Sequence, residues 1–182
     1  MQFIERNFTR MEYKTNDNYW TNGFPNNESY SLLELKAFQL ISIINASQKT
    51  NSIKEFKEYL VRYYELFEVS NLLIELAVQI RNRLDLNNIY DEQILYRIGA
   101  SVGNLITDLE MPENKKVPLT FREACNKIIH TNHINFDLNN PINLFEYESL
   151  NKTVYLYGDF RGKPWKAELD TIEFVRVLLC LK

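Results

Sequence analysis

Apolar residues recur every three or four positions through most of the region from residue 31 to residue 130, which is the spacing of one face of a helix. Three of these segments begin with a Ser or Thr followed three positions later by a Glu, the arrangement of an N-terminal capping box. The interruption at Ser70 and Asn71 is interpreted as a break between two helices, with a bend in one helix as the alternative. The pattern predicts helices over residues 31–47, from 52 to this break, 72–84, 91–110 and 120–130.

The period changes after residue 132, where apolar and polar residues begin to alternate as they do in half-buried strands. This pattern predicts a strand over residues 133–138 and a hairpin whose strands contain Val154 and Trp165. A last short helix is expected from Thr171 to Leu181, with Asp170 as its N-cap and Glu173 three positions later.

We therefore expect a mainly α (α+β) protein, an up-and-down bundle of four to five helices with a small antiparallel sheet near the C-terminus. One domain is expected, with an aromatic arm over residues 1–30, the bundle over 31–132, and the strand, hairpin and terminal helix over 133–182. Gly99 and Gly103 lie within the predicted helix 91–110, where each costs about 1 kcal/mol relative to Ala. The expected reason is the close approach of a neighbouring helix or of a bulky side chain at that face.

Composition restricts the class of protein only broadly. The formal net charge is −3 and 45% of the residues are hydrophobic, so no general basic excess indicates a nucleic-acid partner. Cys125 and Cys180 have apolar neighbours in predicted helices and are expected to be core residues in a reducing cytosol. No membrane-spanning run or cofactor motif is recognised, so we expect a cytoplasmic protein without a cofactor.

Candidate chemistry is concentrated in the predicted helix 120–130. Arg122, Asn126 and His130 follow one another at four-residue intervals and are expected to form one ridge on its polar face. Each also has an ordinary structural interpretation, as a solvated residue or a partner of the last carbonyl groups of the helix. His130 and His133 are spaced like metal ligands, but no Cys or Glu cluster completes a ligand set, and no metal site is predicted.

A second candidate lies in the turn of the predicted hairpin. Arg161 and Lys163 are a basic pair beside an aromatic residue in this loop. Such a pair is able to contact the phosphates of a nucleic acid, although improving the solubility of a turn is the more common role.

The helix from Thr120 to His130, with its segment Asn126-Lys127-Ile128-Ile129-His130, resembles the last core helix of HEPN domains. These are small helical proteins of prokaryotic toxin–antitoxin, defence and RNA-processing systems, and their catalytic members are typically dimers that cleave RNA without metal. Those members carry an Arg immediately before the Asn, where this chain has Cys125. The resemblance therefore implies a non-catalytic interaction module that binds a partner protein, a second copy of itself or RNA.

Two alternatives remain open from the sequence. The chain is a metal-independent endoribonuclease if His130 acts as general acid or base while Arg122 holds the scissile phosphate and Asn126 orients one of them. The second alternative is a small phage-encoded inhibitor or another small cytosolic binding protein, which the sequence does not distinguish from the interaction module.

Overall fold

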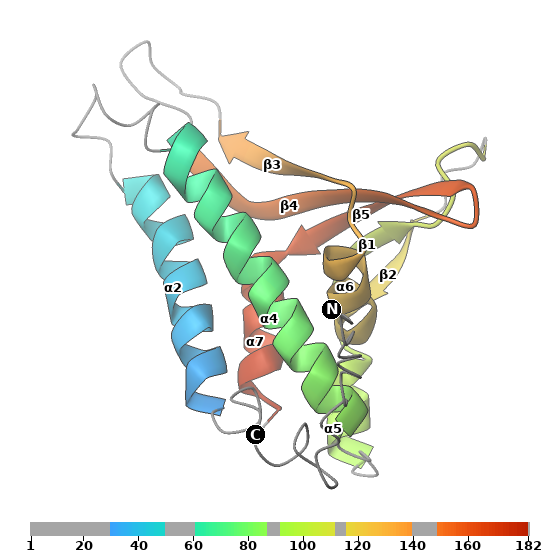
Figure 1. Cartoon of the computed structure of the whole chain (residues 1–182), viewed down its shortest axis with the longest axis horizontal. Helices are drawn as coiled ribbons and strands as arrows, with labels where there is room; N and C mark the ends of the chain where they lie inside the picture. Colours follow the sequence, from blue (N-terminus) through green and yellow to red (C-terminus); the bar gives the residue numbers. More distant parts are fainter. Residues whose placement is uncertain (1–29, 50–60, 87–91, 112–115, 140–148, 182) are drawn as a thin grey trace, which may run out of the picture.

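A computed structural model describes residues 30–49, 61–86, 92–111, 116–139 and 149–181. Within these ranges the chain forms five α-helices, a π-helical turn and a five-stranded antiparallel sheet (Figure 1). The elements in chain order are α2 (Tyr30–Lys49), η2 (Val61–Glu65), α4 (Leu66–Leu86), α5 (Glu92–Ile98), β1 (Ser101–Ile106), β2 (Lys116–Thr120), α6 (Phe121–Ile129), β3 (His133–Asn139), β4 (Ser149–Phe160), β5 (Lys163–Asp170) and α7 (Thr171–Leu179).

The expected helical bundle with a small sheet is wrong, because the sheet spans residues 101–170 and forms a complete layer of the fold. Its strand order is β2-β1-β5-β4-β3, and every neighbouring pair is antiparallel. The predicted strand and hairpin supply β3, β4 and β5. The two strands that the sequence pattern missed, β1 and β2, lie in the predicted helix 91–110 and in the loop that follows it.

Strand β1 passes very close to the neighbouring strand β5 at Gly103. Gly103 has a φ of 153°, and a Cβ at this position would lie 1.9 Å from the carbonyl oxygen of Glu168. Only Gly allows β1 to approach β5 so closely here. Helix α5 ends at Ile98, and Val102, Leu105 and Ile106 are buried in the strand. The close approach expected at Gly103 is therefore that of a strand and not of a helix.

Most of the other predicted helices are confirmed, with one correction. The helices expected at 31–47, 120–130 and 171–181 correspond to α2, α6 and α7. The predicted break at Ser70 and Asn71 is wrong, because α4 runs through both residues without interruption. The Ser70 hydroxyl donates a hydrogen bond to the Leu66 carbonyl at 2.8 Å, and buried Val69, Leu72 and Leu73 hold the helix on the core at this point.

Helices α2, α6 and α7 pack on one face of the sheet, and α4 packs across α2 and α6 (Figure 1). The core lies between the two layers and includes Phe121, Phe174 and Trp165. Ser47, buried in α2, accepts a hydrogen bond from the Leu150 N–H at 2.9 Å and joins the helical layer to β4. The opposite face of the sheet carries polar and aromatic side chains such as Tyr155, Lys166 and Glu168, so the described elements form a helical layer and a sheet layer.

The two cysteines differ in their environments. Cys125 is buried as expected, and burial raises the pKa of its thiol to about 12. Cys180 is exposed at the end of α7, so the expectation that it is a core residue is wrong. The predicted aromatic arm over residues 1–30 and the predicted helix start at Ser52 lie outside the described residues, apart from Tyr30.

Candidate binding cleft

Helix α6 positions the polar side chains of the candidate site. Thr120 is its N-cap, and its hydroxyl accepts a hydrogen bond from the Glu123 N–H at 3.4 Å. The apolar face of the helix is buried through Phe121, Ala124, Cys125 and Ile128. The helix ends at His130, whose backbone N–H donates to the Asn126 carbonyl. Burial of one face and a fixed start and end determine which side chains the helix presents outward.

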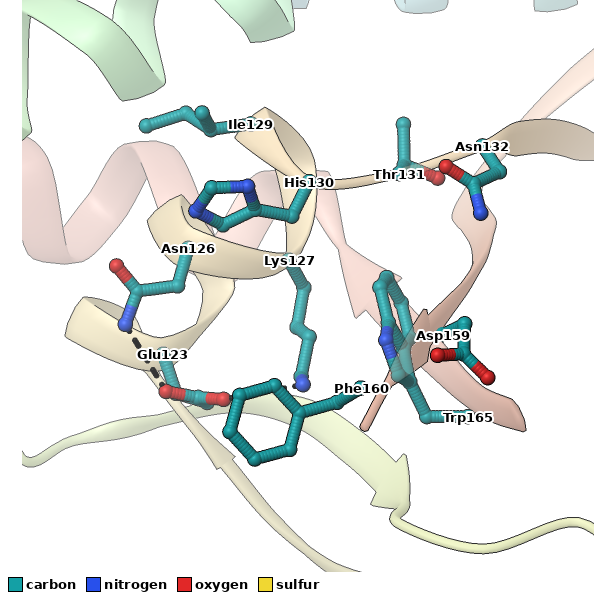
Figure 2. Close-up of a pocket in the computed structure, with 10 residues that line it drawn as sticks. All are labelled: Glu123, Asn126, Lys127, Ile129, His130, Thr131, Asn132, Asp159, Phe160 and Trp165. Carbon is teal, nitrogen blue, oxygen red and sulfur yellow. Dashed lines mark hydrogen bonds and ion pairs between the residues drawn. The ribbon is translucent and has the colours of Figure 1, made fainter. Parts of the chain in front are cut away.

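The outward side of α6 and the tip of the β4–β5 hairpin enclose a cleft of about 810 Å³ (Figure 2). Residues from α6, from the turn that follows it and from both hairpin strands meet here. They are Glu123, Asn126, Lys127, Ile129, His130, Thr131, Asn132, Asp159, Phe160 and Trp165. A cleft of this volume is large enough for a small ligand or for a few side chains of a protein partner.

The inner part of the cleft is a packed arrangement around Trp165. The indole is buried, and the Lys127 ammonium lies 4.4 Å from its ring centroid, at a distance typical of a cation–π contact. Lys127 also pairs with Glu123 at 3.3 Å across one turn of α6. Gly158, on the neighbouring strand, lies directly beneath the indole and beside the His130 carbonyl. Trp165 therefore forms a rigid floor that joins α6 to the sheet.

The polar groups of the cleft are arranged around this floor. The Glu123 carboxylate accepts a hydrogen bond from the Asn126 amide at 3.0 Å, and the Asp159 carboxylate accepts one from the Gly162 N–H at 2.8 Å. The His130 ring makes no hydrogen bond or ion pair with other described residues. Phe160 is 61% exposed. An accessible imidazole and an accessible aromatic ring thus border the cleft.

Of the predicted ridge of Arg122, Asn126 and His130, only two members lie in the cleft. Asn126 and His130 both line the cleft, whereas Arg122 is not among its lining residues. The Arg122 guanidinium instead forms an ion pair with Asp85 of α4 at 2.9 Å, and Asp85 also pairs with Arg81 at 3.0 Å. Arg122 therefore connects α6 to α4, away from the other two members of the ridge.

His133 has surroundings different from those of His130. It is the first residue of β3, and its ring is 2.7 Å from the Asn135 side-chain oxygen and 6.1 Å from the Tyr157 ring. His133 is not among the residues that line the cleft. Among the described residues there is no group of three or more His, Cys, Asp or Glu side chains that is able to hold a metal ion.

The basic pair of the hairpin also lies outside the lining of the cleft. Arg161 has a φ of 56°, a left-handed conformation that allows the tight turn, and its guanidinium is 5.1 Å from the Phe160 ring centroid. Lys163 pairs with Asp108 at 3.3 Å. The sequence pattern identified this loop, but it did not identify Phe160 and Asp159 as the residues that face α6.

Eight of the ten lining residues were not predicted as site residues, among them Lys127, Asp159, Phe160 and Trp165. Lys127 lies inside the segment compared with HEPN domains, and Phe160 is the aromatic residue of the predicted basic loop, so each had a weak local signal. Trp165 and Asp159 had none, because each faces α6 only through the pairing of β4 with β5.

The outer face of the sheet carries a second group of polar residues. Partial burial alone would raise the pKa of the Glu168 carboxyl, but the hydrogen bond and charge of Lys116 outweigh it and hold this pKa below 4.5. Lys116 contacts both carboxylate oxygens at 2.9 Å, and the Asn104 amide contacts one of them at 3.3 Å. These contacts connect β2, β1 and β5.

Comparison of the chain with protein-family models, curated proteins and solved structures gave no match. Among the described helices, none combines the length and the apolar character needed to cross a membrane. Function is therefore inferred from the cleft itself.

Proposed function

We propose that this chain is a non-catalytic binding module and that the cleft between α6 and the β4–β5 hairpin binds a segment of a partner protein. The observation that carries this proposal is the composition of the cleft, which combines exposed Phe160, the rigid Trp165 floor and accessible hydrogen-bonding groups. Aromatic residues with polar neighbours are typical of the centres of protein interfaces. The volume of about 810 Å³ suits a few side chains of a partner loop or peptide.

The charges of the cleft favour a protein segment over a phosphate-rich ligand. Lys127 contributes one positive charge, and Glu123 and Asp159 contribute two negative charges, so these groups sum to −1 with His130 neutral. The single lysine is already paired with Glu123. A phosphate group would meet two carboxylates and would have to displace one of them from its cation.

Metal-independent RNA cleavage remains the alternative because His130 is exposed in the cleft, where its imidazole is accessible to a ligand. That mechanism places Arg122 and His130 at one phosphate. Arg122 is held by Asp85 on the side of α4, which counts against this alternative. The resemblance to HEPN domains stays a prediction. It implies a role in a prokaryotic or phage defence, toxin–antitoxin or RNA-associated system. A role as a phage-encoded inhibitor also stays a prediction.

Peptide selection tests the binding proposal even though the partner is unidentified. A random peptide library displayed on phage is selected on the immobilised full chain, and the enriched peptides are measured by calorimetry. We expect the Phe160→Ser variant to weaken binding at least tenfold. The matched control is Tyr96→Ser, which removes an exposed aromatic side chain from α5, away from the cleft. Peptides that bind both variants equally well, or a selection that enriches no peptide, would refute the proposal.

An RNA cleavage assay with EDTA present tests the alternative. The wild type is compared with His130→Ala, Arg122→Ala and the control Arg176→Ala, which removes an exposed arginine of α7 that pairs with Glu173. We expect no cleavage by any of the four proteins. Cleavage that is lost only in the His130 and Arg122 variants would establish the nuclease and overturn the non-catalytic proposal.

A further inference from the structure

Strand β4 continues past the end of its neighbour β3 at the tip of the hairpin. The pairing of β3 with β4 begins at His133 and Tyr157, whereas β4 runs on to Phe160. One edge of this extension is paired with β5 throughout, and among the described strands none pairs with the other edge. This edge of residues 158–160, called here the free β4 edge, borders the cleft beside Asp159 and Phe160 (Figure 2).

The turn of the hairpin determines which backbone groups the free β4 edge presents. Arg161 and Gly162 have φ angles of 56° and 77°, so they form a two-residue turn of type I′. In such a hairpin the pair that flanks the turn is hydrogen-bonded, and hydrogen-bonded and non-hydrogen-bonded pairs alternate from there. Asp159 and Pro164 are the next pair, so they are not hydrogen-bonded to each other, which agrees with the lack of an N–H on Pro164. The N–H and C=O of Asp159 therefore point away from β5.

These two backbone groups of Asp159 have no partner among the described residues. At the preceding position on the same edge, the Tyr157 carbonyl accepts hydrogen bonds from the Asn132 N–H at 2.8 Å and from the Thr131 hydroxyl at 2.9 Å. Asp159 lies two residues, roughly 7 Å, farther along the strand. Residues 130–132, which satisfy the edge at Tyr157, lead back into α6 and form the opposite wall of the cleft. The free β4 edge thus offers one donor and one acceptor to a ligand in the cleft.

An extended peptide segment is the ligand that this arrangement fits. A sheet takes up a further strand through the unpaired N–H and C=O groups of its edge. A residue opposite Asp159 is able to exchange two hydrogen bonds with it, as in the hydrogen-bonded pairs of an antiparallel sheet. A helical segment satisfies its own N–H and C=O groups, so it would cover those of Asp159 without replacing their hydrogen bonds to water, which is unfavourable.

We propose that the partner segment binds in an extended conformation and adds a short strand to the free β4 edge, beyond the end of β3. This inference rests on the proposed function and specifies how the cleft holds its ligand. Side chains alternate along a strand, so the two neighbours of the residue paired with Asp159 lie on the side of Phe160. Main-chain pairing at Asp159 then supplies affinity, and an apolar side chain packed on exposed Phe160 supplies selectivity.

N-methylation of a bound peptide tests the proposal on the unmodified protein. The probe is the tightest-binding peptide from the selection described above, and each of its backbone N–H groups is replaced in turn by N–CH3. Methylation of the residue paired with Asp159 should raise the dissociation constant at least about tenfold, because it blocks the hydrogen bonds of this pair. Methylation of the residue before or after it should change binding less than about threefold, since those N–H groups point away from β4. Comparable losses at three consecutive positions would overturn the proposal.

Amide exchange of the full chain, followed by NMR, is an independent test. The Asp159 N–H should exchange rapidly in the free protein and at least about tenfold more slowly with the same peptide bound. Asp159→Pro removes this N–H without removing a hydrogen bond to β5. It should weaken binding at least about tenfold more than Asp159→Asn, which removes only the charge and keeps an acceptor for the Gly162 N–H.

The outcomes separate this inference from the proposed function. A peptide that needs Phe160 for binding but leaves the exchange rate of the Asp159 N–H unchanged would overturn the inference, while the proposed function would stand. A selection that enriches no peptide would refute the proposed function, and this inference with it.

Discussion

Gly158 is the position where the packing of the cleft is most sensitive to one added atom. A Cβ on Gly158 would lie 2.3 Å from Cζ2 and 2.7 Å from Cε2 of Trp165, and 2.9 Å from the carbonyl oxygen of His130. Carbon atoms in contact are ordinarily about 3.5–4.0 Å apart, so the indole would have to move by about 1.2–1.7 Å. Trp165 is buried and Lys127 lies over its ring, so little room exists for this movement.

We therefore expect Gly158→Ala to destabilise the protein by about 1–3 kcal/mol, the usual cost of an overpacked core position. For a chain of this length each kcal/mol lowers the melting temperature by about 2–4 °C, so the expected decrease is about 2–12 °C. Thermal unfolding followed by circular dichroism measures it. The emission of Trp165 should also change, and a Trp20→Phe background removes the signal of the other tryptophan.

Gly99→Ala is the control for this prediction. A Cβ on Gly99 would lie 3.5 Å from the Tyr96 carbonyl oxygen and 3.6 Å from that of Leu95, which are ordinary contact distances. We expect its stability to stay within about 0.5 kcal/mol of the wild type. If both variants melt at the wild-type temperature with unchanged Trp165 emission, the close packing of Gly158 against Trp165 is refuted.

Three further predictions concern single interactions. Lys116→Met should raise the pKa of Glu168, which NMR titration measures. Because this pKa is depressed in the folded protein, the ion pair stabilises the fold above about pH 4.5 and this stabilisation is lost at lower pH. Acid unfolding should therefore begin at a higher pH in the variant, and an unchanged acid transition would refute this. A thiol reagent at pH 8 should modify exposed Cys180 rapidly and buried Cys125 only after denaturant is added, and rapid reaction of two thiols in the native protein would contradict this. Thr120→Ala should cost about 1 kcal/mol in thermal unfolding because the N-cap hydroxyl is lost, whereas Thr120→Ser should be near wild type; equal losses in both would rule out the cap.

The candidate site could be predicted in part, because half of it lies on a single helix. The capping residue Thr120 and the helical spacing correctly placed Asn126 and His130 on one exposed side of α6. The same spacing grouped Arg122 with them, but the ion pair with Asp85 holds Arg122 toward α4. Spacing along one helix fixes the direction of a side chain only approximately, and a charged partner on a neighbouring helix decides where a long side chain points.

The sheet shows where local pattern is insufficient. Val102, Leu105 and Ile106 fit a helical period as well as they fit a short buried strand, so the apolar pattern alone could not distinguish the two. The deciding contact is between Gly103 and the backbone of Glu168, 65 positions later in the chain.

The sequence by itself determined the features whose causes are local. These are the start of α6 at Thr120 and of α7 at Asp170, the alternation that forms β3 and the β4–β5 hairpin, and the burial of Cys125 on an apolar helix face. Only the tertiary structure decided the five-stranded sheet and the cleft. Each of these depends on pairing or packing between segments distant in sequence, and the free energy of such contacts does not appear in the pattern of either segment alone.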